Sequence, residues 1–410
     1  MDRLAVDGGS PYRTAEFPRR TPFGDEEVEL VTRAIRSQNL FWSGGTMVNE
    51  FEKEFAGLYG VRHATASSSG TAAIHVAVGT IDPEPGDEII TGPITDAGSI
   101  VPIVYQNAIP IFADINSDYC MDPEDVERKI TPRTKAIMAV HLFGNPCDMD
   151  AMTDIARRHG IFLIEDCSQA HLTEYKGRLL GTFGDIAAFS LQQSKHMTTG
   201  DGGVTITNRD DLAGRMAGFR DKGWARRPGW GPRTYLFLAP NYRMTELQGA
   251  VGLAQLPKVR AVVERRNQLG DYLTSLIGDL PGLDPAPVTP GGKHSYWLYP
   301  LRVKEGTAEE FARALSAEGV PAGAGYIGQP IFLCMEALAG KKTFGASGHP
   351  FDGCHGGRQI QYTAGMTPRA EEELQHMVTL SLNENYTRAD IEDMAGAIRK
   401  VAEGLARRRQ

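Results

Sequence analysis

The alternation of apolar and amphipathic segments between residues 60 and 207 most constrains the fold of this 410-residue chain. Short apolar runs, typical of buried strands, are separated by stretches with helical periodicity. Such alternation favours a mostly parallel sheet that is wrapped by helices and binds ligands at the carboxyl ends of its strands. The expected strands are 62–66, 88–91, 109–115, 135–141, 161–165, 186–190 and 203–207, and helical patterns lie at 70–78, 123–129 and 149–159. We predict an α/β protein with a seven-stranded sheet and helices on both faces.

The pattern changes after residue 245. Residues 245–277 have a helical pattern, which Pro257 is expected to break or kink because proline has no amide hydrogen. Such a long helix commonly joins a large domain to a small one. The later expected elements are a loop at 281–292, a strand at 296–303 and helices at 308–318 and 388–405. We therefore predict a large domain (residues 1–270, with an N-terminal arm) and a smaller C-terminal α+β domain (271–410).

Composition excludes several classes of protein. Apolar residues make up 41% and charged residues 23% of the chain, as in ordinary globular proteins. The net charge of −8 argues against a nucleic-acid partner. No apolar run reaches the roughly 18 residues of a membrane span, and the N-terminus lacks the apolar core of a secretory signal. We expect no membrane partner and a cytoplasmic location.

The cysteines predict neither disulfides nor a metal site. Five cysteines without a repeating spacing favour reduced thiols. His349, Cys354 and His355 are close in sequence, but their spacing matches no closed zinc site. We predict that the protein holds no metal.

Lys195 is the strongest candidate for a catalytic residue. It lies in a polar loop after the strand at 186–190 and before a glycine cluster, and Asp166 ends a strand 29 residues upstream. A lysine amine can form a Schiff base with the aldehyde of pyridoxal phosphate. A carboxylate can hold the pyridine nitrogen of that cofactor protonated, so that the ring withdraws electrons. A loop lysine alone would more simply be solvated, but its pairing with Asp166 favours pyridoxal phosphate.

A Ser/Gly/Thr cluster at residues 67–71 predicts a phosphate site. It lies between a strand and a helix, where free amides and the positive end of the helix dipole suit a dianion. Capping of the helix by Ser69 or Thr71 would need no ligand. Together with Lys195 and Asp166, however, the cluster favours phosphate, to which Ser190 can add a hydroxyl group.

Several motifs, in this order along the chain, resemble the DegT/StrS family of aminotransferases, which aminate keto-sugars and keto-cyclitols with pyridoxal phosphate. They are Trp42-Ser43-Gly44-Gly45, Ser69-Gly70-Thr71, Glu165-Asp166-x-x-Gln169, Ser190-(x)4-Lys195, Gly200-Asp201-Gly202-Gly203 and Pro240-Asn241-Tyr242-Arg243-Met244. The resemblance implies fold type I architecture and a homodimer with shared active sites. It implies that glutamate or glutamine is the amino donor and that a keto-sugar or keto-cyclitol is the acceptor. The implied cofactor contacts are Lys195 in the Schiff base, Asp166 at the pyridine nitrogen, Gln169 at the ring, Gly70, Thr71 and Ser190 at the phosphate, and Asn241 at the phosphate of the partner subunit.

Two positions depart from the family pattern. Asp96 stands where the family usually has an aromatic residue that stacks on the cofactor ring, and Lys222 stands where it often has histidine. Asp96 could face the substrate, or it could simply cap the helix that begins near residue 97. With Arg243 and Tyr326, it is one of three candidate substrate residues.

Two other functions remain as alternatives. Family dehydratases replace the lysine with histidine, whereas here the lysine stands first and His196 follows it. A non-catalytic relative that acts as a sensor or scaffold would not need Asp166, Lys195 and Ser190 together. The sequence therefore favours an aminotransferase.

Overall fold

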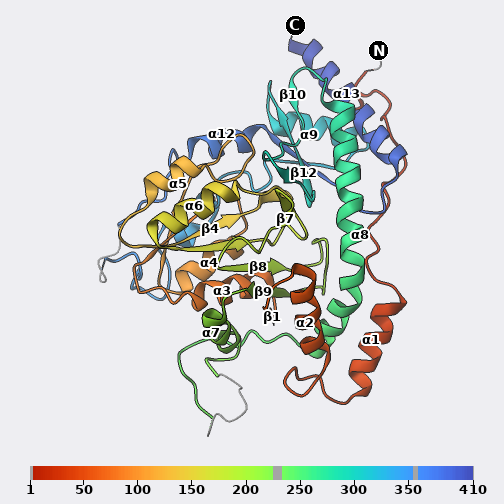
Figure 1. The fold of residues 1–410 in the computed structure, drawn as a ribbon. Coiled ribbons are helices and arrows are strands. Elements are labelled where there is room, and N and C mark those ends of the chain that lie inside the picture. Colours follow the sequence, from red (N-terminus) through yellow and green to blue (C-terminus); the bar gives the residue numbers. More distant parts are fainter. Residues whose placement is uncertain (1–2, 225–232, 354–358, 410) are drawn as a thin grey trace.

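The computed structural model describes residues 3–224, 233–353 and 359–409 (Figure 1). Its larger sheet has seven strands in the order β1-β9-β8-β5-β4-β2-β3. These are β1 (His63–Ser67), β2 (Glu88–Thr91), β3 (Ile109–Phe112), β4 (Thr134–Val140), β5 (Phe162–Asp166), β8 (Ile186–Ser190) and β9 (Gly203–Thr207). Neighbouring pairs from β3 to β8 are parallel, and β9 pairs antiparallel with β8 and β1. The predicted mostly parallel sheet of seven strands is confirmed.

Helices cover both faces of this sheet, which explains why its strands are apolar throughout. The helices around it are α2 (Met47–Tyr59), α3 (Gly70–Thr80), α4 (Ala97–Tyr105), α5 (Pro123–Lys129), α6 (Met149–His159) and α7 (Asp210–Arg220). Met138 of β4 packs in one apolar layer with α3 and α7, while its neighbours Ile137 and Ala139 pack in the other with α2 and α6. Because successive side chains of a strand point to opposite faces, both layers draw on the same strands.

The long helix α8 (Glu246–Ile277) passes through Pro257 without a break, so the break that we expected there is wrong. Proline removes one hydrogen bond, but packing holds the helix on both sides of it: α8 contacts α1 (Asp25–Arg36), α2 and α13 (Arg388–Arg409). Buried Leu256 and Val259 lie in the core directly beside the proline. Tertiary packing therefore outweighs the local preference.

A second, four-stranded sheet lies at the far end of α8 (Figure 1). It is antiparallel and has the order β10 (Leu283–Asp284), β12 (Leu298–Val303), β14 (Met377–Ser381) and β13 (Ala322–Ala324). With α9 (Ala308–Ala317) and α13, it forms a separate apolar core that includes Phe311, Leu380 and Ile398. The proposed domain division at residue 270 falls inside α8 and remains a proposal.

The remaining elements are short and were mostly not predicted. They are η1 (Ala5–Asp7), η2 (Leu142–Gly144), α10 (Ile331–Cys334), α11 (Glu336–Ala339), α12 (Pro368–His376) and a small sheet of β11 (Gly292–Lys293), β6 (Glu174–Tyr175) and β7 (Arg178–Leu179). The segment 281–292, expected to be a loop, holds β10 and the start of β11. The N-terminal arm runs beside α8 from α13 to α1 (Figure 1). Among the described residues, no helix is both long enough and apolar enough to cross a bilayer.

Candidate active site

A cavity of about 370 Å³ lies at the carboxyl ends of β1, β2, β5 and β8. Its walls come from the loops that follow these strands and from two aromatic residues of the C-terminal half. Eight of the ten predicted site residues line it: Gly70, Thr71, Asp96, Asp166, Gln169, Ser190, Lys195 and Tyr326. The structure thus brings together residues that are spread over 250 positions of the chain, at the edge where parallel sheets bind ligands.

The N-terminus of α3 opens into this cavity. Ser69 caps the helix, because its Oγ accepts a hydrogen bond from the amide of Ala72 at 3.1 Å. The first turn of a helix still leaves amides without partners inside the helix, here those of Gly70 and Thr71. A Cβ atom on Gly70 would lie 2.7 Å from the Ser190 hydroxyl, so only glycine permits this approach. Capping and anion binding are therefore compatible here, and the phosphate site stays a prediction.

Asp166, at the end of β5, is buried and held in one orientation. Its Oδ2 accepts a hydrogen bond from the Ser99 hydroxyl at 2.7 Å, and its Oδ1 accepts one from the amide of Ser168 at 3.0 Å. The hydroxyl groups of Ser99 and Thr95 are also hydrogen-bonded, at 2.7 Å. This chain of contacts fixes the carboxylate without using a charged partner, which leaves it able to bind a cationic ring nitrogen.

Gln169 links the cavity to the C-terminal half of the chain. Its Oε1 accepts a hydrogen bond from the amide of Phe143 at 2.7 Å, and its Nε2 donates one to the Tyr326 hydroxyl at 3.3 Å. Burial raises the pKa of Tyr326, so its phenol stays protonated at neutral pH. Gln169 thus positions a hydroxyl group that remains a possible hydrogen-bond donor.

Lys195 is buried, with 9% of its surface exposed. Burial lowers the pKa of its amine to about 8, against the opposing effect of the negative charges of Asp166 and Asp96. The Nζ atom lies 3.6 Å from the centre of the Trp297 ring, and the indole nitrogen of Trp297 donates to the carbonyl of Ser194 at 3.1 Å. Among the described residues, no hydrogen bond or ion pair reaches this amine. A buried amine with a lowered pKa is typical of lysines that react with carbonyl groups.

The position of Asp96 is compatible with both roles that the sequence left open. It is the N-cap of α4, and its Oδ1 accepts a hydrogen bond from the amide of Gly98 at 2.7 Å. It also lines the cavity. Helix capping is therefore observed, and a substrate role stays a prediction.

Asn241 and Arg243 do not line the cavity of their own chain. Arg243 forms an ion pair with Asp221 at 2.9 Å, and Asn241 pairs with Asp221 through a backbone bridge. Lys222, at the second departure from the family pattern, also forms an ion pair with Asp221, at 3.2 Å. The expected contact of Asn241 with a partner subunit stays a prediction.

The sequence analysis assigned no role to several residues that line the cavity, among them Thr95, Ser99, Ser168 and Trp297. Ser99 is one helical turn beyond the cap of α4, a spacing that only becomes informative once α4 is placed beside β5. Trp297 lies within the expected strand 296–303, directly before β12, and an aromatic residue in such a pattern fits a buried core equally well.

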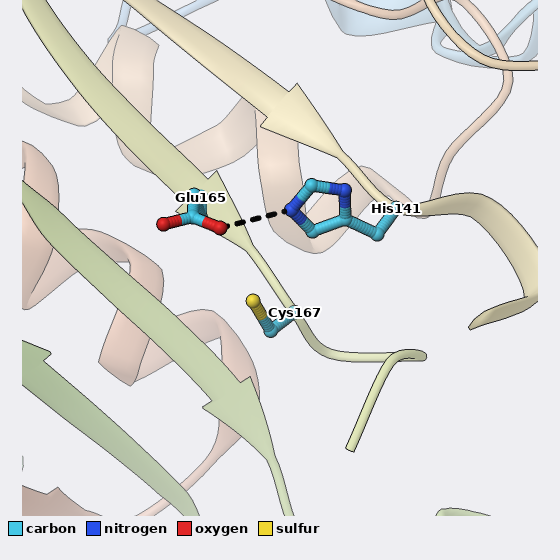
Figure 2. Close-up of side chains that lie close together, drawn as sticks. All are labelled: His141, Glu165 and Cys167. Carbon is cyan, nitrogen blue, oxygen red and sulfur yellow. Dashed lines mark hydrogen bonds and ion pairs between the residues drawn. The ribbon is translucent and has the colours of Figure 1, made fainter. Parts of the chain in front are cut away.

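A buried cluster of His141, Glu165 and Cys167 has the residue types of a metal site (Figure 2). Their ligand atoms lie within 4.8 Å of one another, and His141 Nε2 is 3.4 Å from Glu165 Oε2. Hydrogen bonds account for this arrangement, however. Glu165 accepts backbone N–H groups from Gly181, Phe183 and Gly184, and Nδ1 of His141 accepts the amide of Cys147. Burial raises the pKa of the Cys167 thiol to about 12, which disfavours a thiolate ligand.

The absence of a metal thus remains a prediction. Of the three residues weighed as a zinc site in the sequence, Cys354 and His355 lie outside the described residues.

Comparison with known proteins identifies the family. The profile of the DegT/DnrJ/EryC1/StrS aminotransferase family matches residues 23–341. The chain belongs to this family. It is 37% identical over 294 residues to a putative L-glutamine:3-amino-2,3-dideoxy-scyllo-inosose aminotransferase of Micromonospora echinospora, covering 69% of this chain and 68% of the relative. It is 39% identical over 302 residues to GDP-perosamine synthase of Caulobacter vibrioides, covering 72% and 79%.

The solved structures agree with this assignment. S. venezuelae DesV superposes with a TM-score of 0.83 at 28% identity, covering 95% of this chain and 99% of DesV. The expected fold type I architecture is confirmed, and the chain is an aminotransferase by family.

Proposed function

We propose that this protein uses pyridoxal phosphate to transfer an amino group from glutamate or glutamine to a keto-sugar or keto-cyclitol. The observation that carries this proposal is the buried Lys195 amine, whose pKa is lowered to about 8, in one cavity with the fixed Asp166 carboxylate. Membership of an aminotransferase family supports the reaction type.

The residues of the cavity fit this cofactor. The amides at the start of α3 and the Ser190 hydroxyl suit its phosphate, and the Asp166 carboxylate suits its ring nitrogen. The side-chain oxygen of Ser168 is buried at the cavity and has no hydrogen-bond partner among the described residues, so a bound group could satisfy it. When bound, pyridoxal phosphate would supply an aldehyde carbon that takes up nitrogen from the donor and a ring that withdraws electrons.

The protein's own contribution is to bind, orient and move protons. With a pKa near 8, the Nζ of Lys195 can both accept and return a proton close to neutral pH, which suits the shift of a proton from the α-carbon of the amino donor. The Asp166 carboxylate would keep the pyridine nitrogen of the bound cofactor protonated. The indole of Trp297 covers the amine on one side and limits its exposure to water.

Relatives of two kinds support the proposed class of acceptor. One is named as an aminotransferase of an inosose, a cyclitol ketone, and the other as a synthase of a GDP-linked aminosugar. The candidate contacts to this acceptor are Asp96 and Tyr326, which line the cavity, and Arg243, which does not line it within this chain. We propose a homodimer in which Asn241 completes the phosphate site of the partner.

The placement of His196 weighs against dehydration. Its Nε2 is hydrogen-bonded to the carbonyl of Ser295 at 2.9 Å, and His196 does not line the cavity. Lys195 therefore occupies the position from which the reacting base would act.

The test is spectroscopic. The purified protein with pyridoxal phosphate should change its absorbance when glutamate or glutamine is added, and recover when a suitable keto-sugar or inosose follows. A panel of such ketones would identify the acceptor, and Lys195→Ala is the control. Lack of a change with every amino donor would contradict the proposal and favour a non-catalytic relative.

A further inference from the structure

We propose that Arg20, in the N-terminal arm, is a positioning residue that holds the backbone on both sides of Lys195. Its Nη1 donates to the carbonyl of Gln193 at 3.0 Å, and its Nη2 donates to the carbonyl of His196 at 2.8 Å. These carbonyls flank Lys195 in the loop between β8 and β9. Arg20 itself does not line the cavity, so it acts only through this loop.

The third nitrogen of the guanidinium is also used. The Nε of Arg20 donates to Glu384 Oε1 at 2.7 Å, in the turn after β14. Only 14% of the Arg20 side chain and 15% of the Glu384 side chain are exposed, so solvent screens this pair weakly. The planar fork of arginine can hold three acceptors at once, which a lysine ammonium on a flexible stem cannot do in the same geometry.

Glu384 is itself fixed from the other side. Arg266, in α8, donates from Nε at 3.1 Å and from Nη2 at 2.9 Å to Glu384 Oε2, and its side chain is 2% exposed. Burial opposes the ionisation of Glu384, but the two guanidinium groups outweigh it and hold the pKa of Glu384 below its usual value. The carboxylate is therefore charged at neutral pH and anchors Arg20 firmly.

The neighbours of Glu384 hold the arm on which Arg20 lies. The side-chain amide of Asn383 donates to the carbonyl of Pro18 at 3.0 Å, and that of Asn385 donates to the carbonyl of Arg19 at 2.8 Å. The turn at 383–385 is thus hydrogen-bonded to the backbone on the N-terminal side of Arg20. One continuous set of contacts then runs from the C-terminal sheet through the arm to the loop of the reacting lysine.

This arrangement matters because the Lys195 amine has no hydrogen-bond partner among the described residues. Its position depends on its backbone and on the ring of Trp297. A displacement of about 1 Å in a reacting group can cost a factor of about 100 in rate. The clamp made by Arg20 limits that displacement.

The test compares Arg20→Ala and Arg20→Lys with the matched control Arg19→Ala. Arg19 is the adjacent arginine, and its side chain is 87% exposed. Hydrogen–deuterium exchange of residues 191–199 should become about 10-fold or more faster in Arg20→Ala, while exchange in β4 stays unchanged. In turnover, kcat should fall about 10- to 100-fold with KM for both substrates within about 2-fold. Arg20→Lys keeps the charge but not the fork, and should recover only part of the loss.

Two results would overturn the proposal. One is that residues 191–199 exchange in Arg20→Ala as slowly as in the Arg19→Ala control. The other is that Arg20→Lys has the exchange and the kcat of the wild type, which would mean that charge alone suffices. If Arg20→Ala does not fold, Glu384→Gln keeps Arg20 and weakens its anchor. Faster exchange of the same segment would then support the clamp, and unchanged exchange would refute it. The exchange measurement requires no turnover, so it stands apart from the proposed function.

Discussion

The lowered pKa of Lys195 makes a quantitative prediction for cofactor capture as a function of pH. Only the neutral amine attacks an aldehyde. With a pKa of about 8, about a quarter of the amine is neutral at pH 7.5, whereas an ordinary lysine with a pKa of 10.5 would be about 0.1% neutral. The lower pKa corresponds to about 3 kcal/mol of free energy that disfavours the charged amine, and it makes about 200-fold more neutral amine available at pH 7.5.

The assay mixes cofactor-free protein with pyridoxal phosphate between pH 6 and 10.5 and traps the product with borohydride. The rate should rise about tenfold per pH unit below 8 and level off above it. Lys195→Ala gives the background from other lysines and should form no trapped bond at the active site. A midpoint above about 10 would show that the amine is solvated and would refute the reasoning.

The same shift predicts a change in stability. Because the pKa of Lys195 is lower in the folded protein, the unfolded chain binds more protons between pH 8 and 10.5, and stability rises with pH in that range. Below pH 8 the amine is charged in both states, so burying its charge lowers the free energy of unfolding by the full amount. Lys195→Met should therefore be more stable than the wild type at pH 7, by up to about 3 kcal/mol, and this advantage should vanish as the pH approaches 10.5.

Four further experiments test the site. Asp166→Asn should keep the fold but lose most activity, because an amide cannot hold the ring nitrogen protonated; a near-native rate would remove this residue from the site. Gly70→Ala should weaken cofactor binding at least about tenfold, since its Cβ would displace the neighbouring serine, and unchanged affinity in a titration would count against the phosphate site. Asp96→Asn should raise KM for the amino acceptor and leave KM for the amino donor unchanged, whereas a purely capping role predicts a lower Tm with native KM for both. Lys195→Ala and an Asn241 variant with little activity, when refolded together, should form heterodimers that regain activity, because one of the two sites then has both native residues. Verified heterodimers without activity would show that Lys195 and Asn241 serve the same chain's site.

The sequence predicted the larger sheet well because both of its faces are buried. Each strand is then a short apolar run that needs no knowledge of its neighbours, as Ile186–Ser190 illustrates. The C-terminal half was harder to predict. β13 has only three residues and is defined by its pairing with β14, and α8 continues through Pro257 because of contacts from three other helices.

The candidate site residues also divide into those that a local sequence pattern indicates and those that depend on the folded structure. Lys195 and Asp166 could be singled out in the sequence because Asp166 ends one strand of the larger sheet and Lys195 lies in the loop after another. Each side chain can also carry the proposed chemistry by itself. Ser99 and Trp297 act through proximity, which exists only after folding. Arg20 is the extreme case: 173 residues separate it from the carbonyl that it binds at Gln193, and nothing in the local pattern of the arm points to that contact.

Asp96 caps a helix, and we propose that it also takes part in the reaction. Its Oδ1 caps α4, and among the described residues no hydrogen bond reaches its Oδ2. Asparagine would keep an oxygen for the cap and remove the charge, so the two roles separate in one variant. The charge of Asp96 also raises the pKa of Lys195, against the effect of burial. Removing that charge should therefore move the midpoint of cofactor capture to lower pH. An aromatic residue at this position would have left the lysine without this opposing charge, so the departure from the family pattern at Asp96 affects the Lys195 amine as well as the wall of the cavity.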